Sequence, residues 1–311
     1  MKRKLLIGLG LAIALLILGA WRVHPYLAET RPSGGRAVVV EGWLPMELFQ
    51  SAARIIRERG YDRIYVTGTE RLFAYFLEQD VSLQVILTEA RSGELLVNVS
   101  GIDGGRLVIL ADADTLMDRY VTGQPTDLRT HLPAGTRALR LISLHDRTLD
   151  RGTRNLFIKD LRINGNNVHG LCRELRYLHA DGRITGGSPT FAEWGSEQLI
   201  EAGLPPGSLV AVPASQVSGS RTLSNALAFS ERASVDGITA VDVLSLGVHA
   251  RRSRRTYQEA CGTGVVVGVV SLPDPATPAD GWWRSPLGIV RVLKEVFGLP
   301  ASEVLHAAEV G

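Results

Sequence analysis

Residues 240–272 read AVDVLSLGVHARRSRRTYQEACGTGVVVGVVSL and carry the clearest structural pattern in the chain. The largely apolar run AVDVLSLGV (240–248) is typical of a strand buried on both faces. The polar segment His249–Cys261 that follows predicts a helix, and VVVGVVSL (265–272) predicts a second buried strand. A strand, a helix and a strand in this order indicate two parallel strands joined by a right-handed crossover.

The same alternation recurs on both sides of this stretch. AVVVEGW (37–43) and RIYVTGT (63–69) are expected to be buried strands, with a helix over Met46–Arg59 between them. Further elements are expected at Pro189–Ala202 (helix), LVAVPA (209–214, strand), Arg221–Ser234 (helix) and Pro286–Phe297 (helix). The sequence therefore predicts an α/β fold with a Rossmann-like parallel sheet.

Residues 80 to 165 show a different rhythm. Alternating runs such as LQVILTEA, GELLVNVSG and RLVILADAD are separated by turns rich in Gly, Asp and Asn. Strands at this spacing indicate an antiparallel β-sandwich, inserted after the second strand of the parallel sheet. The expected boundaries are 36–69 and 186–298 for the discontinuous Rossmann-like domain, and 80–168 for the sandwich.

The N-terminus predicts a membrane anchor within residues 1–22. Three basic residues at positions 2–4 precede Leu5–Trp21, which carries no charge and would span roughly 25 Å as a helix. The positive-inside rule places the basic residues in the cytoplasm and the bulk of the chain in the periplasm, outside the inner membrane. A cleaved signal peptide is the alternative.

The composition narrows the function classes. The formal net charge is +2, from 34 basic and 32 acidic residues, and three of the basic residues lie in the N-terminal cluster. A nearly neutral remainder argues against a nucleic-acid-binding protein. The two cysteines, Cys172 and Cys261, would face an oxidising compartment, and the sequence leaves open whether they pair.

An arginine cluster begins at the edge where an open parallel sheet binds its ligands, beyond the carboxyl ends of the strands. His249 follows a predicted strand, and Arg251 and Arg252 lie in the first turn of the next predicted helix. Cations at a helix N-terminus are unfavourable unless an anion is bound there. We therefore expect Arg251 and Arg252 to bind an anionic group, whereas Arg254 and Arg255 fit a solvated helix face better.

Two further groups are expected at this edge. Arg221 and Thr222 begin the helix after LVAVPA, where they either contact the ligand or belong to a helix cap with Ser220. Glu41 ends a predicted buried strand, so it is either an acid–base group or a partner for one of the arginines.

Five motifs together resemble the SanA/ElyC/YdcF family of envelope proteins: VVVEGWLP (38–45), VTGT (66–69), SRTLSNA (220–226), LGVHARRSR (246–254) and WWRSPLG (282–288). The resemblance implies a Rossmann-like fold, an N-terminal anchor and a role in cell-envelope biogenesis. It points to Glu41, Gly42, Thr67, Gly68, Arg221, Thr222, His249, Arg251 and Arg252. Ser220 departs from the pattern, because relatives often carry an acid there.

The segment SLHDRTLDRGTRNLFIKDLRING (143–165) resembles the end of calcium-dependent, xylan-binding carbohydrate-binding modules. Asp146 matches one acid of that pattern, but Thr153 and Lys159 replace two others, and Asp160 stands one position along. The resemblance implies calcium held by Asp146 and Asp160 as the one cofactor to expect. Calcium prefers several oxygen ligands, and two of the expected carboxylates are missing here. The alternative is therefore a sandwich that has a structural role or contacts another protein.

Two hypotheses remain open. In the first, an envelope hydrolase or transferase acts on a phosphorylated or lipid-linked glycan, with His249 and Glu41 as catalytic groups. The groups that would bind its substrate are Gly42, Thr67, Gly68, Arg221, Thr222, Arg251 and Arg252. In the second, a scaffold protein binds envelope polysaccharide without chemistry. Nucleotide binding ranks below both, because the sequence has no glycine-rich phosphate loop.

Overall fold

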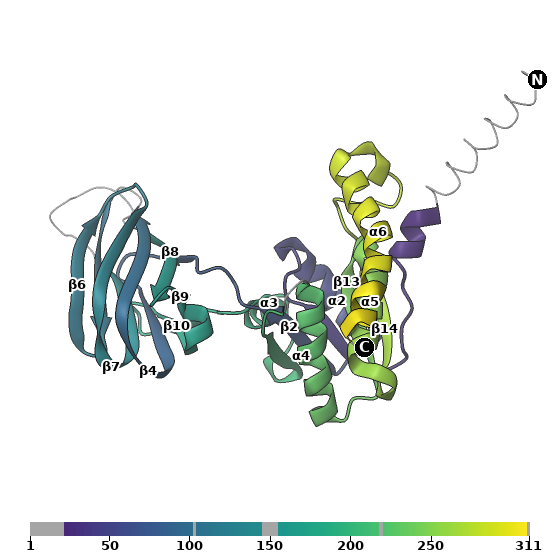
Figure 1. Cartoon of the computed structure of the whole chain (residues 1–311), viewed down its shortest axis with the longest axis horizontal. Coiled ribbons are helices and arrows are strands. Elements are labelled where there is room, and N and C mark those ends of the chain that lie inside the picture. Colours follow the sequence, from purple (N-terminus) through teal and green to yellow (C-terminus); the bar gives the residue numbers. More distant parts are fainter. Residues whose placement is uncertain (1–21, 102–103, 145–154, 218–219, 310–311) are drawn as a thin grey trace, which may run out of the picture. The chain divides into compact units, whose positions relative to one another are not determined.

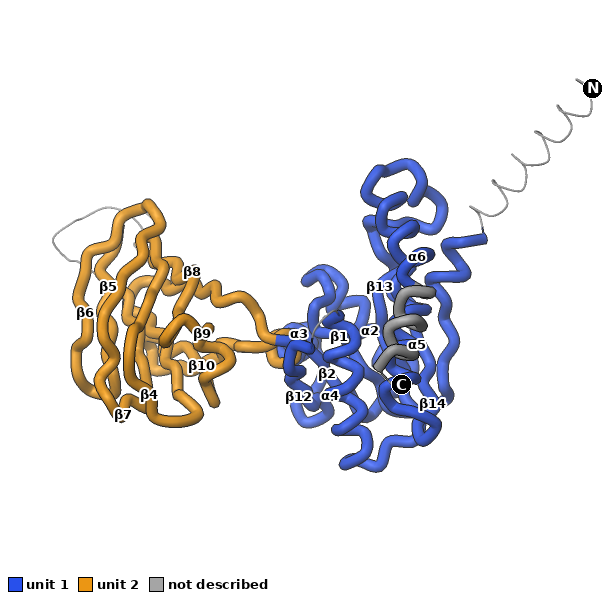
Figure 2. Tube along the Cα trace, viewed as in Figure 1, with its two compact units in different colours: residues 1–69, 195–311 blue, residues 70–194 orange. Residues whose placement is uncertain are grey.

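The computed structural model describes residues 22–101, 104–144, 155–217 and 220–309, with side chains through residue 298. The chain divides into two compact units (Figure 2). Unit 1 comprises the chain up to Thr69 and from Gly195 onwards, and unit 2 comprises Glu70–Trp194. Unit 2 therefore enters the chain of unit 1 directly after that unit's second strand.

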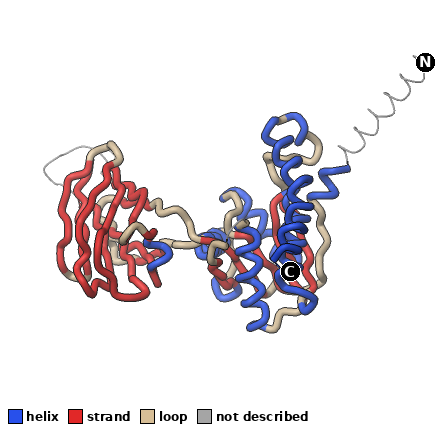
Figure 3. Tube along the Cα trace, viewed as in Figure 1, coloured by secondary structure: helices blue, strands red, loops and turns tan. Residues whose placement is uncertain are grey.

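Unit 1 is built on a five-stranded parallel sheet (Figures 1 and 3). Its strands are β1 (Ala37–Glu41), β2 (Arg63–Thr69), β12 (Leu209–Ala214), β13 (Ala240–Leu246) and β14 (Val266–Leu272). Their order is β12-β2-β1-β13-β14, so the chain first builds outward from β1 on one side and then returns to build on the other. This is the doubly wound order, and its switch point lies between β1 and β13. Every residue of β1 is buried, which explains its continuous apolar run.

The labelled helices of unit 1 are α2 (Phe49–Arg59), α4 (Arg221–Asp236), α5 (Ala250–Cys261) and α6 (Pro286–Glu309), and residues 22–27 are also helical. Helix α3 (Phe191–Glu201) begins in unit 2 and ends in unit 1. Helices α4 and α5 pack together on one face of the sheet, where Phe229 and Tyr257 contact Tyr65 and its neighbours. Ser220 caps α4 by accepting a hydrogen bond from the backbone N–H of Leu223.

The strand predicted for 240–248 ends at Leu246. Gly247 adopts a left-handed φ of 47°, and the 3-10 turn η4 (Gly247–His249) follows. His249 therefore lies in a turn between β13 and α5 and not in the helix itself. A second short turn, η6 (Trp282–Arg284), precedes α6, which extends well beyond its predicted end.

Unit 2 is an antiparallel sheet of nine strands: β3 (Tyr75–Leu77), β4 (Ser82–Gly101), β5 (Gly105–Ala111), β6 (Asp114–Val121), β7 (Thr126–Leu144), β8 (Leu156–Ile163), β9 (Asn166–Asn167), β10 (Cys172–Leu178) and β11 (Ile184–Gly186). The prediction of a two-sheet sandwich is corrected in one respect, because these strands form one continuous, curled sheet. Strand β4 connects the parts of this sheet and makes it continuous. It pairs with β7 on one side, while its first part pairs with β10 and its second part with β8 on the other.

The runs LQVILTEA and GELLVNVSG, predicted as separate strands, are two parts of β4. Irregular pairing between Ile86 and Gly93 bends the strand, and Gly93 has a φ of 113°, so this glycine marks a bulge and not a turn. Val85 in the first part and Val97 in the second are both fully buried, so both parts of the strand face the same core.

The chain segments that enter and leave unit 2 pair with each other. Glu70 and Thr190 form an antiparallel bridge, and the backbone N–H of Arg71 donates to the carbonyl of Pro189 at 3.0 Å. The Arg71 guanidinium also donates to the Ser188 carbonyl at 2.9 Å. These contacts fix the two ends of the insertion side by side.

No helix within the described residues is both long and apolar enough to cross a membrane. The predicted anchor, Leu5–Trp21, lies outside the described residues. Cys172, in unit 2, and Cys261, in unit 1, are both free thiols.

Candidate functional site

A pocket of about 800 Å³ lies at the carboxyl ends of the parallel strands, where the strand order reverses. Its lining comes from the segments after four strands and from three helices: Trp43, Pro45, Gln216, Ser220, Arg221, Thr222, Leu246, Val248, His249, Arg252, Asp274, Arg291, Lys294 and Glu295. The topology therefore brings together residues from distant parts of the sequence at one edge of the sheet.

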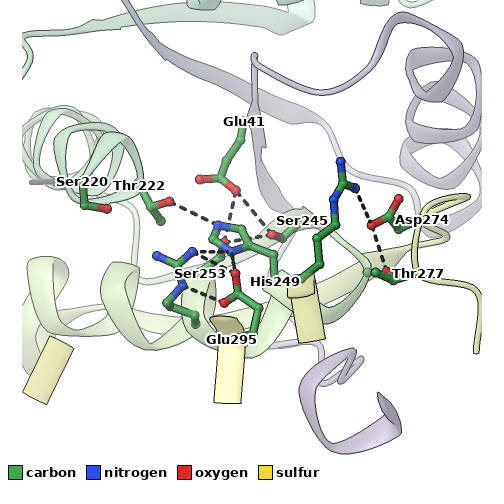
Figure 4. A network of polar contacts seen from close by, with 12 residues as sticks. Glu41, Ser220, Thr222, Ser245, His249, Ser253, Asp274, Thr277 and Glu295 are labelled. Atoms are coloured by element: carbon green, nitrogen blue, oxygen red, sulfur yellow. Dashed lines mark hydrogen bonds and ion pairs between the residues drawn. The ribbon is translucent and has the colours of Figure 1, made fainter. Parts of the chain in front are cut away.

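His249 has polar partners on both ring nitrogens (Figure 4). Its Nε2 lies 3.2 Å from the hydroxyl of Thr222, and its Nδ1 lies 3.2 Å from Oε1 of Glu295. The Trp43 ring makes an edge-on contact with the imidazole, with the ring centroids 5.6 Å apart. A terminal nitrogen of Arg252 also lies 3.0 Å from Nδ1. The ring is thus held between a hydroxyl, a carboxylate, a guanidinium and an aromatic side chain.

Glu295 is the carboxylate that organises this group. It lies on α6 and accepts two hydrogen bonds from Arg252, at 2.7 Å from Nε and 3.0 Å from a terminal nitrogen. Burial of Glu295 raises its pKa, but the hydrogen bonds from His249 and Arg252 outweigh burial and lower the pKa to about 2. The carboxylate is therefore ionised at neutral pH.

The contacts of Nδ1 favour neither neutral tautomer of His249. Besides Oε1 of Glu295 at 3.2 Å, Nδ1 lies 3.0 Å from a terminal nitrogen of Arg252, and a guanidinium can only donate. A neutral ring with its proton on Nδ1 donates to Glu295, whereas a ring with its proton on Nε2 accepts from Arg252 and donates to the hydroxyl of Thr222. A carboxylate, an imidazole and a hydroxyl in this order form an arrangement suited to acid–base chemistry.

Arg251 and Arg252, which were predicted from the sequence to bind an anion, both have carboxylate partners within the protein. Arg252 lines the pocket, but its guanidinium is bound to Glu295. Arg251 donates to Glu29 at 3.0 Å and stacks on Tyr26, outside the set of pocket-lining residues. Arg254, expected on a solvated face, also donates to Glu29 at 2.7 Å, and its side chain is only 18% exposed.

Two other cations remain available in the pocket. Among the described residues, Arg221 and Lys294 have no ion-pair partner, and both are exposed. Arg291 is paired with Asp274 at 3.3 Å. Arg221 also opens the sixteen-residue helix α4, whose first N–H groups and dipole favour a negative charge at the same place. The pocket therefore offers an anion two free cations and a helix N-terminus.

Glu41 is not among the residues that line the pocket. It is fully buried, and its Oε2 accepts hydrogen bonds from Ser245 at 3.3 Å and Ser253 at 3.1 Å (Figure 4). Thr67 is also fully buried and contacts the hydroxyl of Tyr257 at 2.9 Å. Burial raises the pKa of Tyr257 well above its ordinary value, with Glu41 contributing to the shift, so this phenol stays protonated.

The structure thus assembles part of the predicted set at the pocket: Arg221, Thr222, His249 and Arg252. It places the others elsewhere: Glu41, Gly42, Thr67, Gly68 and Arg251. Sequence reasoning missed Glu295, Lys294 and Trp43. Glu295 carried one signal, since it is the only acidic residue between positions 281 and 298.

Of the two residues predicted to hold calcium in unit 2, only Asp160 lies within the described residues. The carboxylate of Asp160 accepts a hydrogen bond from Arg162 at 2.6 Å, and the amino group of Lys159 lies over the Phe157 ring. The described residues contain no group of three or more His, Cys, Asp or Glu side chains placed to hold a metal ion. Asp146 lies outside the described residues.

Comparison with known proteins shows only distant similarities. No family model and no curated protein matches the sequence. Among solved structures, the capsular polysaccharide assembling protein CapF from Staphylococcus aureus is 14% identical, with a TM-score of 0.17, over 33% of this chain and 26% of CapF. A family two carbohydrate esterase from Clostridium thermocellum, in complex with cellohexaose, is 9% identical, with a TM-score of 0.23, over 65% of this chain and 86% of the esterase. Scores this low carry no argument about fold or function.

Proposed function

We propose that this protein is anchored in the inner membrane, faces the periplasm and acts in cell-envelope biogenesis on an anionic glycan intermediate, phosphorylated or lipid-linked. The observation that carries the proposal is the pocket in which His249 is held between Thr222 and Glu295, beside the free cations Arg221 and Lys294. The motifs shared with the SanA/ElyC/YdcF family and the N-terminal sequence support the envelope setting. The inserted unit 2 would hold the glycan.

The roles in the pocket follow from the geometry. His249 accepts or donates a proton through Nε2, which faces the hydroxyl of Thr222, while Glu295 and Arg252 hold the other ring nitrogen. Arg252 positions Glu295 through its paired hydrogen bonds. Arg221 and Lys294, together with the N-terminus of α4, bind the anionic group of the substrate. We assign the anion to these two cations because Arg251 and Arg252 already have carboxylate partners.

Binding of inorganic pyrophosphate to the full-length protein tests the anion site. Calorimetric titration should show binding, and both Arg221→Ala and Lys294→Ala should weaken it by roughly 10–150-fold, the equivalent of about 1.5–3 kcal/mol. Arg54→Ala removes an exposed cation on α2, away from the pocket lining, and should leave binding unchanged. Equal affinity in all four proteins would show that the pocket is not the anion site.

The same titration, combined with a growth assay, distinguishes an enzyme from a protein that only binds the glycan. His249→Gln should retain pyrophosphate affinity within a few-fold, because the anion contacts are elsewhere in the pocket. The same variant is also expressed in a strain that lacks the gene. If it supports growth to the same extent as the native protein, the protein binds envelope glycan and does not catalyse a reaction on it.

A further inference from the structure

The outer face of α6 exposes an unusual number of apolar side chains. They recur at helical spacing and are Leu287, Ile289, Val290, Leu293 and Phe297. Val290 is 61% exposed and Phe297 is 71% exposed, while Val292 on the opposite side is buried. Contiguous exposed apolar surface on a helix marks a contact with another apolar phase.

The N-terminal segment packs against the inner side of the same helix. Residues 22–27 are helical, and Leu27 forms a buried cluster with Trp282 and Val292, with Val23 packed at its edge. The uncharged sequence Leu5–Trp21 ends immediately before this segment. If that sequence crosses the bilayer, the membrane surface lies close to residues 22–27, and therefore close to the part of α6 against which they pack.

The charges around this face suit an anionic surface. Between positions 281 and 298 the only acid is Glu295, which is buried and bound to Arg252. The basic residues Arg284, Arg291 and Lys294 are all exposed, and of these Arg291 is paired with Asp274 at 3.3 Å. An amphipathic helix with an apolar face bordered by cations is typical of helices that lie in a membrane interface.

We propose that the outer face of α6, defined by the five exposed apolar residues above, rests in the interfacial layer of an anionic lipid bilayer. The proposal depends on the membrane anchor of the proposed function and adds to it. Lys294 and Glu295 on α6 also line the pocket, so this contact holds the pocket beside the lipid headgroups. The substrate class that fits is a lipid-linked anionic glycan, presented from the membrane surface.

A second copy of this chain is a less suitable partner for the outer face of α6 than the bilayer is. Pairing two identical faces would bring Arg284 and Lys294 of one copy close to the same cations of the other, with no exposed acid between positions 281 and 298 to offset them. The bilayer offers negative headgroups to the cations and an apolar phase to the side chains.

Spin labels on the full-length chain test this contact. Cys172 and Cys261 are first replaced by serine, and one label is attached through Val290→Cys. The matched control is Val235→Cys at the end of α4, where the native side chain is 82% exposed. Both proteins are reconstituted in phosphatidylcholine vesicles containing one-third phosphatidylglycerol, and collision rates with oxygen and with a water-soluble nickel chelate are measured.

The label at position 290 should collide with oxygen several-fold more, and with nickel several-fold less, than the label at position 235. Equal collision rates with nickel at the two positions would overturn the proposal. Shielding of position 290 from both reagents, or dipolar broadening of its spectrum, would also overturn it by showing a protein contact. If the chain fails to float with the vesicles at all, the anchor itself, and with it the proposed membrane setting, is wrong.

Discussion

Replacing Glu295 by glutamine removes the charge that links His249 and Arg252 while keeping the shape of the side chain. The carboxylate is 9% exposed, so solvent screens its interactions little. Its pKa is lowered from 4.5 to about 2 in the folded protein. Since one pKa unit corresponds to about 1.4 kcal/mol, ionised Glu295 stabilises the fold by about 3 kcal/mol relative to its protonated form.

The pH dependence has a definite sign. A carboxyl whose folded pKa is lowered contributes its full stabilisation above the unfolded value of 4.5, and loses it as the pH falls from there towards 2. At pH 7 we therefore expect Glu295→Gln to lower the free energy of unfolding by about 2–3 kcal/mol. The difference from the native protein should shrink steadily below pH 4.5.

Urea unfolding followed by tryptophan fluorescence measures this difference, since Trp282 packs beside α6. Glu259→Gln on the exposed side of α5 is the matched control and should change stability by less than about 0.5 kcal/mol. Native-like stability of Glu295→Gln at pH 7, or a deficit that is equally large at pH 3, would refute the assignment of Glu295 as the ionised partner of His249 and Arg252.

Two further variants test other parts of the structure. Glu29→Ala should destabilise the protein by about 2–3 kcal/mol in urea, because it leaves Arg251 and Arg254 mostly buried without their carboxylate; unchanged stability would contradict this pairing. In unit 2, burial lowers the pKa of His169 to about 4, so stability should fall as the pH drops from 6.5 towards 4, when only the unfolded chain takes up the proton. His169→Gln should reduce this pH slope, and a slope equal to that of the native protein would show that another group causes it.

The parallel sheet was predictable because its strands are buried on both faces and therefore appear as continuous apolar runs, such as AVVVEGW. The edge of the sheet where the pocket lies could be predicted from the ends of these strands, and this placed His249 and Thr222 there. The curled sheet of unit 2 was harder, because Gly93 looks like a turn residue in sequence but forms a bulge within the twenty-residue strand β4.

The partners of the arginines could not be predicted from the sequence. Glu29 and Glu295 lie far from residues 251–254 in the chain, and only packing brings them together. A cluster of cations in the sequence shows where positive charge is concentrated, but it does not show which carboxylates will pair with it in the folded protein. Arg221 and Lys294, which look less prominent in sequence, are the pocket cations that folding leaves free among the described residues.

In the proposed function, His249 transfers a proton at the pocket edge of the parallel sheet. The most direct test of this step is His249→Gln, expressed in a strain that lacks the gene and purified in parallel for thermal melting. Glutamine keeps a polar side chain of similar length, so we expect melting within about 4 °C of the native protein, as for a change near 1 kcal/mol, together with complete loss of complementation. Full complementation by this stably folded variant would contradict the account.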